Sequence, residues 1–258
     1  MAKRTTTSFF ETYPEEYDAL TGADSRAVPH GKEVDALIAR FQPTAVLDAG
    51  CATGLTSSLF ARKGVSAVGL DRSRPMLAFA TKKFEDLKDN LTFKYGQFEK
   101  LPRTLTEKFD LVVCLANAIT GVGNQKGLRE ALTGFHRCLR PGGHLVLQLL
   151  NYVSMAEGQL FPIKATSERD IVYERFSERL GKRINLYVTR ADLSVSPVKL
   201  EVFRHEFDNF TVNQVEAVVR RSGFVGLKRY GNLRMDQTFR KTGRDLVLIA
   251  RKSERRGS

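Results

Sequence analysis

The sequence predicts an α/β fold, in which a doubly wound and mostly parallel sheet carries an antiparallel β insertion and an N-terminal helical lid. Three observations predict it. Short β-rich runs alternate with helix-length segments between about residues 44 and 150, as in βαβ units with right-handed crossovers. Later segments alternate apolar and polar residues, as half-buried antiparallel strands do. The glycine-containing turn AGCATG follows the first β-rich run, where doubly wound sheets bind ligands.

The elements of the core have separate signals. The polar N-terminal segment is predicted to be helical, and a further helix is predicted over 31–41, because apolar residues recur at helical spacing until Pro43 ends the pattern. The strands and helices expected next are, in order, TAVLDAG, a helix from about Thr53, VSAVGLD, a helix near 75–88, LTFKYGQ, FDLVVCLAN, a helix near 126–139 and HLVLQLL.

The last third is predicted to form a hairpin-based insertion and then to return to the core. The antiparallel strands are expected at DIVYERFSE, RINLYVTRADLSV and VKLEVFRHEFDNF. A helix over 211–222 follows, with Thr211 as N-cap and Gly223 just past its end. FVGLKRYG and DLVLIARK are the expected closing strands, separated by a loop through 232–243. The domain organisation expected is a lid over 1–30, a ligand-binding core over 31–151, a substrate cap over 152–210 and a closing segment over 211–258.

Composition limits the class of protein. The chain has 258 residues, of which 42% are hydrophobic, enough for one large domain with a real core. No run has the length of a membrane span, and the N-terminus lacks the apolar stretch of a signal peptide, so a cytoplasmic location and no membrane association are expected. The three cysteines, without CxxC spacing, predict neither a disulfide nor a metal site.

The formal net charge is +12, and its meaning is left open by the sequence. A basic surface gains affinity for nucleic acid through counterion release. The basic residues are interspersed with acidic ones, however, and do not form one uniform run. A solvated basic surface, a site for an anionic small molecule and a nucleic-acid surface therefore all remain possible interpretations.

The turn AGCATG is flanked by two acids that indicate the kind of ligand. Gly50 and Gly54 have the spacing G-x-x-x-G, whereas a dinucleotide fingerprint reads G-x-G-x-x-G. Asp48, just before the turn, would repel a pyrophosphate and would suit a positively charged group. Asp71 ends the next strand, where a carboxylate can accept both hydroxyl hydrogens of a ribose. Together they predict a nucleoside with a cationic tail.

These motifs make the chain resemble the class I S-adenosylmethionine-dependent methyltransferases. The matching segments are LDAGCATG, Asp71, YGQFEKLP, FDLVVCLAN and RPGGHLVLQ, in family order over nearly the whole chain. The resemblance implies a Rossmann-like sheet of seven strands. Within the family the chain is most similar to the small-molecule branch around glycine N-methyltransferase, on the segments YDALTGADSR, CLAN and LNY.

The resemblance implies S-adenosylmethionine as cofactor and assigns residues to it. Asp71 would hold the ribose, Met76 would cover the adenine, and Gln97 and Phe98 would border it. Arg26 would pair with the cofactor carboxylate. The other cofactor-binding residues expected are Tyr17, Asp48, Gly50, Cys51, Gly54, Arg72 and Leu115. The substrate-binding residues expected are Tyr17, Asn117, Asn151 and Arg175. The insertion arginines Arg169, Arg175, Arg179 and Arg190 are either exposed strand residues or include one or two that clamp a substrate carboxylate or phosphate, and the sequence does not say which.

The chain departs from the family pattern in three places. Ala52 stands where a central glycine of the turn is usual, and Gln97 replaces an acid. Gly121 takes the place of a histidine, which removes one candidate base, so no catalytic residue is assigned. His136 and His144 are expected to be structural, while His205 and His30 stay open.

Three functions follow from these observations. The leading interpretation is methyl transfer to a small-molecule acceptor, most simply an amine or amino-acid nitrogen, because a neutral amine needs no strong base. The alternative is an RNA methyltransferase that uses the basic surface. A cofactor-binding partner protein without activity is the third. The oligomeric state cannot be deduced from one sequence.

Overall fold

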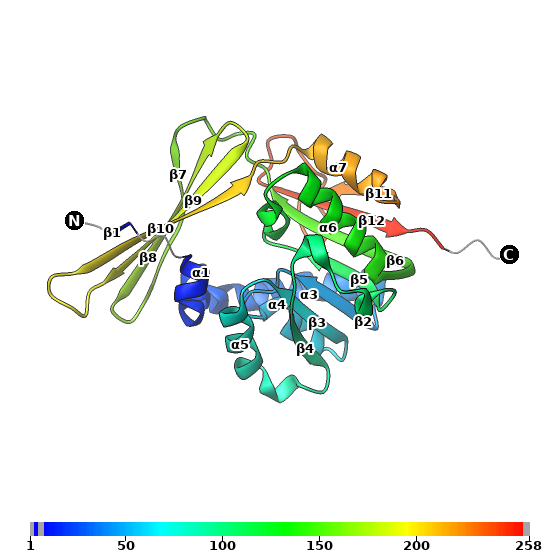
Figure 1. Cartoon of the computed structure of the whole chain (residues 1–258), viewed down its shortest axis with the longest axis horizontal. Coiled ribbons are helices and arrows are strands. Elements are labelled where there is room, and N and C mark those ends of the chain that lie inside the picture. The colour runs from blue at the N-terminus through cyan, green and yellow to red at the C-terminus, as the bar shows by residue number, and fades with distance from the viewer. Residues whose placement is uncertain (1–2, 5–7, 255–258) are drawn as a thin grey trace.

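The computed structural model describes residues 3–4 and 8–254 and contains two sheets (Figure 1). The larger has seven strands, and only β12 runs antiparallel to its neighbours. In sheet order the strands are β11 (Phe224–Tyr230), β12 (Asp245–Lys252), β6 (Leu139–Leu150), β5 (Phe109–Cys114), β2 (Ala45–Ala49), β3 (Ser66–Asp71) and β4 (Leu91–Tyr95). The predicted doubly wound α/β class is confirmed.

Helices cover both faces of this sheet and create two cores. The helices are α3 (Ala23–Phe41), α4 (Leu55–Arg62), α5 (Arg74–Lys83), α6 (Gln125–Cys138) and α7 (Val212–Arg221). Neighbouring residues of one strand enter different cores: Val46 packs with α3 and α4, whereas Leu47 packs with α6 and α7. Both are fully buried, which explains why the strand has a continuous apolar sequence.

The second sheet is formed mainly by the predicted insertion, which projects to one side of the core (Figure 1). Its order is β1 (Lys3–Arg4), β10 (Lys199–Asp208), β9 (Arg183–Asp192), β8 (Ile171–Leu180) and β7 (Leu160–Glu168). Strands β7 to β10 pair antiparallel, and β1 pairs parallel to β10. A small core fills one face of this sheet, made by Phe9, Leu20, Tyr173, Val188 and Phe203.

The N-terminal segment 9–21 lies between the two sheets and is bonded to both. It contains α1 (Phe9–Thr12), the 3-10 turn η1 (Pro14–Glu16) and α2 (Tyr17–Thr21). The Arg190 guanidinium on β9 donates to both oxygens of Glu16, at 2.7 and 2.8 Å. We call this pair the Glu16–Arg190 clamp. On the other side, Thr53 Oγ1 donates to Asp18 Oδ1 at 2.6 Å. The segment therefore connects the antiparallel sheet to the glycine-containing turn.

Four elements differ from the sequence-based expectation. Helix α3 begins at Ala23 and not near residue 31, and it continues through Pro29, although a proline beyond the first turn removes one backbone hydrogen bond. Helix α5 ends at Lys83, where Phe84 turns into the core. Strand β6 starts at Leu139, since the PGG segment forms a bulge in its pairing with β5. Strand β7 was not expected at all, as its residues are partly or fully exposed and do not alternate cleanly.

The remaining helix and strand assignments are confirmed. Helix α7 has Thr211 as N-cap in a capping box with Gln214, and Gly223 follows with φ +94°. All three cysteines are buried and free. None of the helices in the described residues combines the length and apolar character needed to cross a membrane.

Candidate active site

The turn between β2 and α4 lies at the carboxyl end of the parallel strands. Gly50 and Cys51 N–H groups both donate to Leu70 O, at 2.7 and 3.1 Å, so the turn is held against the end of β3. Gly50 has φ +87°, and a Cβ there would lie 2.6 Å from Ala118 Cβ. Gly54, with φ +85°, is required by packing, because its Cβ would lie 2.6 Å from Phe93 Cζ.

Asp71 is fixed at the end of β3 by the backbone around it. Its Oδ2 accepts from the Ala52 N–H and its Oδ1 from the Ser73 N–H, each at 2.9 Å. Each carboxylate oxygen keeps a second lone pair for another donor. Ser73 Oγ accepts from the N–H of Met76, whose side chain is buried at the start of α5. A rigid acceptor pair beside a close-packed turn fits the ribose of S-adenosylmethionine.

Ala52 shows how the turn manages without a central glycine. Its φ is +48°, a left-handed conformation that costs an alanine about 1–2 kcal/mol. The N–H bond to Asp71 holds it there. We expect Ala52→Gly to raise the free energy of unfolding or to leave it nearly unchanged, measured by urea denaturation, because glycine adopts this conformation freely but gains entropy when unfolded. A loss above about 1 kcal/mol would show that the methyl group packs usefully.

Asp48 lies beneath the turn and is almost completely buried, with 2% of its surface exposed. Ser57 Oγ donates to its Oδ2 at 2.6 Å. Burial raises the pKa of this carboxyl from its usual value near 3.8 to about 6, although the Ser57 hydrogen bond acts in the opposite direction. The carboxyl is therefore mostly protonated at pH 5 and mostly ionised at neutral pH, and a cation nearby would favour its ionised form further.

This shift predicts a pH dependence of cofactor binding. The ionised form of Asp48 attracts a positive charge, so the affinity for S-adenosylmethionine should rise as pH increases through about 6. Between pH 5 and 7.5 we expect a gain of about three- to tenfold, measured by calorimetric titration at constant ionic strength. Asp48→Asn should flatten the profile. An unchanged slope in this variant would place the titrating group elsewhere.

Tyr17 and Asp18 cover the glycine-containing turn. Besides the bond from Thr53, Asp18 receives a short bond from Lys83 Nζ of α5. Burial raises the pKa of Tyr17 above its usual value of 10, with the charges of Arg26 and Arg175 acting against the shift. The Tyr17 hydroxyl is consequently protonated at neutral pH. Its ring meets that of Phe10 edge to face, with centroids 5.8 Å apart.

Three arginines from distant parts of the chain lie near one another, since Arg26 and Arg175 are near Tyr17 and Arg244 is near Arg175. Burial lowers the pKa of Arg175 on β8, and the positive charges of Arg26 and Arg244 lower it further, while Tyr17 acts in the opposite direction. Arg175 Nε is buried without a hydrogen-bond partner. Within residues 3–4 and 8–254, none of the three forms an ion pair with a carboxylate. We call them the arginine cluster; it carries an excess of positive charge that suits anionic ligands.

The two predicted asparagines hold the strand ends next to this cluster. Asn117 Oδ1 accepts from the Leu150 N–H at 3.1 Å, and its Nδ2 donates to Tyr152 Oη at 3.2 Å. Asn151 Nδ2 donates to the carbonyl oxygens of Lys241 and Gly243, at 2.7 and 2.8 Å. Asn151 thus orders the loop that presents Arg244. Burial raises the pKa of Tyr152 to about 12, so its hydroxyl stays protonated.

The other predicted cofactor residues lie around the turn. The Phe98 ring faces Gly50 and meets Phe135 at 5.6 Å, while Gln97 is exposed beside it. Arg72 Nη1 donates to the Gly121 carbonyl oxygen at 3.3 Å. Cys51 and Leu115 are buried. Direct contact of these residues with a cofactor stays a prediction.

The two histidines that the sequence left open differ in their hydrogen bonding. His30 bonds to Glu33 at 2.8 Å and to Thr56 at 2.9 Å. His205 on β10 stacks on Phe10 with centroids 4.3 Å apart, and its Nε2 is buried without a partner. Burial and the nearby Arg72 charge lower the pKa of His205 to about 4, so it is neutral at physiological pH. Its role as a base remains open.

Sequence reasoning missed three residues of this region. Asp18 follows the predicted Tyr17, but no motif around it indicates the hydrogen bonds that it accepts from Thr53 and Lys83. Arg244 stands in a loop without a motif. Glu16 pairs with a residue 174 positions away, a separation that local patterns do not reveal.

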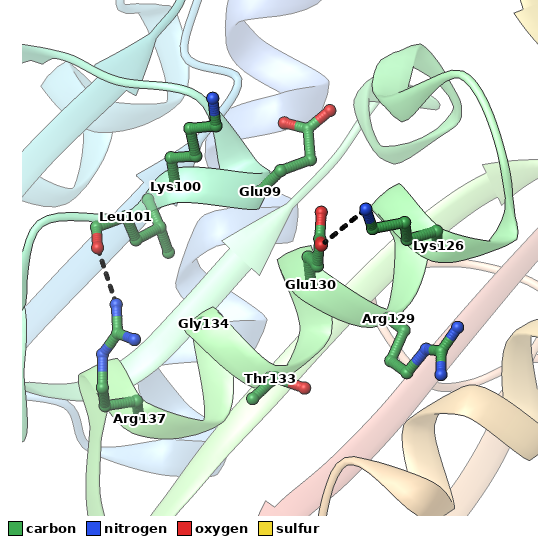
Figure 2. Close-up of a pocket in the computed structure, with 9 residues that line it drawn as sticks. All are labelled: Glu99, Lys100, Leu101, Lys126, Arg129, Glu130, Thr133, Gly134 and Arg137. Atoms are coloured by element: carbon green, nitrogen blue, oxygen red, sulfur yellow. Dashed lines mark hydrogen bonds and ion pairs between the residues drawn. The ribbon is translucent and has the colours of Figure 1, made fainter.

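A separate concavity of about 500 Å³ lies between the 3-10 turn η3 (Phe98–Lys100) and α6 (Figure 2). Its basic residues share the surface with Glu99 and Glu130, and Lys126 lies 3.9 Å from Glu130. Arg137 reaches back to the Leu101 carbonyl oxygen at 2.7 Å. Across the described part of the chain, no group of three metal-ligating side chains occurs.

Comparisons with known proteins agree with this geometry. Residues 46–143 match the sequence profile of a family described as a methyltransferase domain. A glycine/sarcosine N-methyltransferase of Parasynechococcus marenigrum is 28% identical over 150 residues, covering 58% of this chain and 53% of that protein. The glycine N-methyltransferase of Mus musculus is 32% identical over 118 residues, covering 42% of this chain and 40% of that protein. The chain thus matches about half the length of these curated relatives or less.

Solved structures share the fold over nearly the whole chain. An S-adenosylmethionine-dependent methyltransferase from Clostridium acetobutylicum superposes with a TM-score of 0.76 at 15% identity, covering 95% of this chain and 99% of that one. An amino pentose methyltransferase from Micromonospora echinaspora, solved with S-adenosylmethionine bound, superposes with a TM-score of 0.68 at 23% identity. The match covers 88% of this chain and 91% of that one. Residues 46–143 of this chain thus match a methyltransferase domain, and the described chain has the Rossmann-like fold of these solved S-adenosylmethionine-dependent methyltransferases.

Proposed function

We propose that the protein transfers the methyl group of S-adenosylmethionine to the nitrogen of a small amine that carries a carboxylate, such as an amino acid. The observation that carries the proposal is the arginine cluster: Arg26 and Arg175 lie near the partly buried Tyr17, Arg244 lies near Arg175, and the Arg175 Nε is buried without a hydrogen-bond partner. One carboxylate of the cofactor neutralises a single charge. The surplus favours an acceptor that brings a second carboxylate. The two similar proteins, a glycine/sarcosine N-methyltransferase and a glycine N-methyltransferase, support the same acceptor class.

The residues divide the work between the two ligands. Asp71 holds the ribose hydroxyls and the glycine-containing turn lies against the methionyl part. Arg26 takes the cofactor carboxylate, while Arg175 and Arg244 orient the acceptor carboxylate. Tyr17 and Tyr152 stay protonated and keep hydroxyl groups that can hydrogen-bond to a ligand.

Positioning supplies most of the catalysis in this scheme. Bound S-adenosylmethionine would supply an electrophilic methyl group: the lone pair of the neutral amine would form the C–N bond in line as the S–CH₃ bond breaks, leaving S-adenosylhomocysteine and a protonated methylated amine. The amine needs no protein base, which agrees with the glycine at position 121. The segment 9–21 is bonded to the turn through Asp18 and Thr53, and the antiparallel sheet is bonded to the same segment, so the two would limit the access of water to the reacting groups.

The test is a methyl-transfer assay with labelled S-adenosylmethionine and matched acceptors. Glycine and sarcosine should be methylated, and ethanolamine, which lacks the carboxylate, should react at least about 100-fold more slowly. Equal rates with ethanolamine would exclude the carboxylate clamp. Labelled RNA with no labelled amine would instead establish the RNA methyltransferase alternative.

Arg175→Gln is the variant that tests the clamp. We expect kcat/KM for the carboxylate acceptor to fall about 100-fold, because a charge-assisted bidentate pair is lost. The affinity for S-adenosylhomocysteine should change less than about threefold. Arg204→Gln, at an exposed position of β10 next to Glu206, is the matched control and should leave both values unchanged. A fall in cofactor affinity equal to the fall in kcat/KM would move Arg175 to the cofactor.

A further inference from the structure

A second basic concavity lies away from the cofactor turn, on the face of the larger sheet next to the end of α3. Its volume is about 340 Å³. The lining comes from the last turn of α3, the middle of β6, the middle and end of β11 and the end of β12. The residues that line it are Arg40, Phe41, His144, Gly226, Lys228, Tyr230, Ile249, Ala250 and Arg251.

The charge of this lining is of one sign. Arg40, Lys228 and Arg251 carry three permanent positive charges, and the lining contains no Asp or Glu. In the described chain, Arg40 and Lys228 form no ion pair. Arg251 bonds to Glu254 at 2.9 Å, but the Glu254 side chain is 73% exposed and free to move into water. The concavity of Figure 2 differs, since two carboxylates line it.

The floor of the concavity is aromatic. The rings of His144 and Phe41 lie 4.7 Å apart at an angle of 36°, and Tyr230 lines the same space. Cations held around an aromatic floor match a ligand that joins an anion to a planar ring.

We propose that this concavity is a binding site for a phosphate ester. Arg40, Lys228 and Arg251 would hold the phosphate, and the ring attached to it would lie on Phe41 and Tyr230. We call it the phosphate pocket. It is independent of the proposed methyl transfer, because no residue of the cofactor turn or the arginine cluster lines it. A phosphate of a small ester and a phosphate of an RNA strand share this chemistry.

His144 provides an internal reporter of the site. Burial lowers its pKa, and the charges of Arg251 and Arg40 lower it further. A bound dianion would offset those two charges and raise the pKa. Titration of the His144 ring by NMR, assigned with His144→Gln, therefore reads occupancy of the pocket without any assay of methyl transfer.

The experiment uses inorganic phosphate, phenyl phosphate and a short single-stranded RNA as probes of the full-length protein. We expect the His144 pKa to rise by about half a unit or more with a saturating probe. Phenyl phosphate should bind more tightly than phosphate by about three- to tenfold if the aromatic floor contributes. Stronger binding of RNA that falls steeply with salt would identify a strand as the source of the phosphate.

Two variants with the same charge change decide whether the site is specific. Lys228→Gln should weaken the binding of phenyl phosphate about tenfold. Arg129→Gln, in the concavity of Figure 2, should change the affinity for phenyl phosphate by less than about twofold. Both variants should bind S-adenosylhomocysteine as the unmodified protein does, which shows that they fold. An unchanged His144 titration with every probe, or equal losses in the two variants, would overturn the proposal.

Discussion

Asp71→Asn is expected to weaken the binding of S-adenosylhomocysteine at least about 100-fold, equivalent to about 3 kcal/mol. The carboxylate accepts from two backbone N–H groups and would also accept from the ribose. The amide offers a single oxygen, and its NH₂ group would face one of those N–H donors. The loss therefore combines missing hydrogen bonds with a repulsive contact. Calorimetric titration measures it directly.

Asp86→Asn is the matched control for this change. Asp86 is exposed and pairs only with the exposed Arg62, at 3.1 Å. Its removal should leave the affinity within about twofold. Micromolar binding retained by Asp71→Asn would place the ribose elsewhere and would remove the main support for the assigned cofactor site.

Arg190→Met should lower the free energy of unfolding by about 3–5 kcal/mol, measured by urea denaturation or as a lower Tm. The Arg190 side chain is 8% exposed and its partner Glu16 is 19% exposed. Asp192 and Glu201 also lie 3.5 Å from Arg190. Loss of the guanidinium leaves three carboxylates close together without their shared cation, which is why the effect exceeds that of a surface pair.

A double variant shows how much of the loss of stability in Arg190→Met comes from the unpaired charge on Glu16. Glu16→Gln with Arg190→Met should be less destabilising than the sum of the single changes, because the unpaired charge on Glu16 is gone. Arg62→Met, which breaks the exposed pair with Asp86, should cost less than about 1 kcal/mol. Cofactor affinity should also fall in Arg190→Met, since Tyr17 adjoins Glu16. Equal stability of Arg190→Met and Arg62→Met would contradict the buried clamp.

The larger sheet was predictable because each of its strands carries a local signal. Buried parallel strands give continuous apolar runs, as at FDLVVC, and the antiparallel strands alternate. β7 gave neither pattern, since it is an edge strand with a proline and little burial on either face. The start of α3 was missed because Pro29 has the appearance of a helix boundary although the helix continues through it.

The residues of the site also divide into those with a local sequence signal and those without one. Gly50 and Asp71 belong to short motifs whose spacing follows from the strand-turn-helix geometry, so sequence alone could locate them. Arg244 and Glu16 acquire their positions only from tertiary packing. Arg244 depends on the loop that Asn151 holds, and Glu16 depends on a partner on β9. No local pattern specifies either arrangement.

Segment 9–21 and the antiparallel sheet should be treated as one exchangeable part. Glu16 is bonded to Arg190 and Tyr173, and Tyr13 to Glu201, so the beginning of the chain is matched to strands encoded more than 150 residues later. A chimera that receives the sheet of another methyltransferase would leave these acids without partners unless it also receives that protein's N-terminal segment. The antiparallel sheet is therefore transferable only together with segment 9–21, although the two are far apart in the sequence.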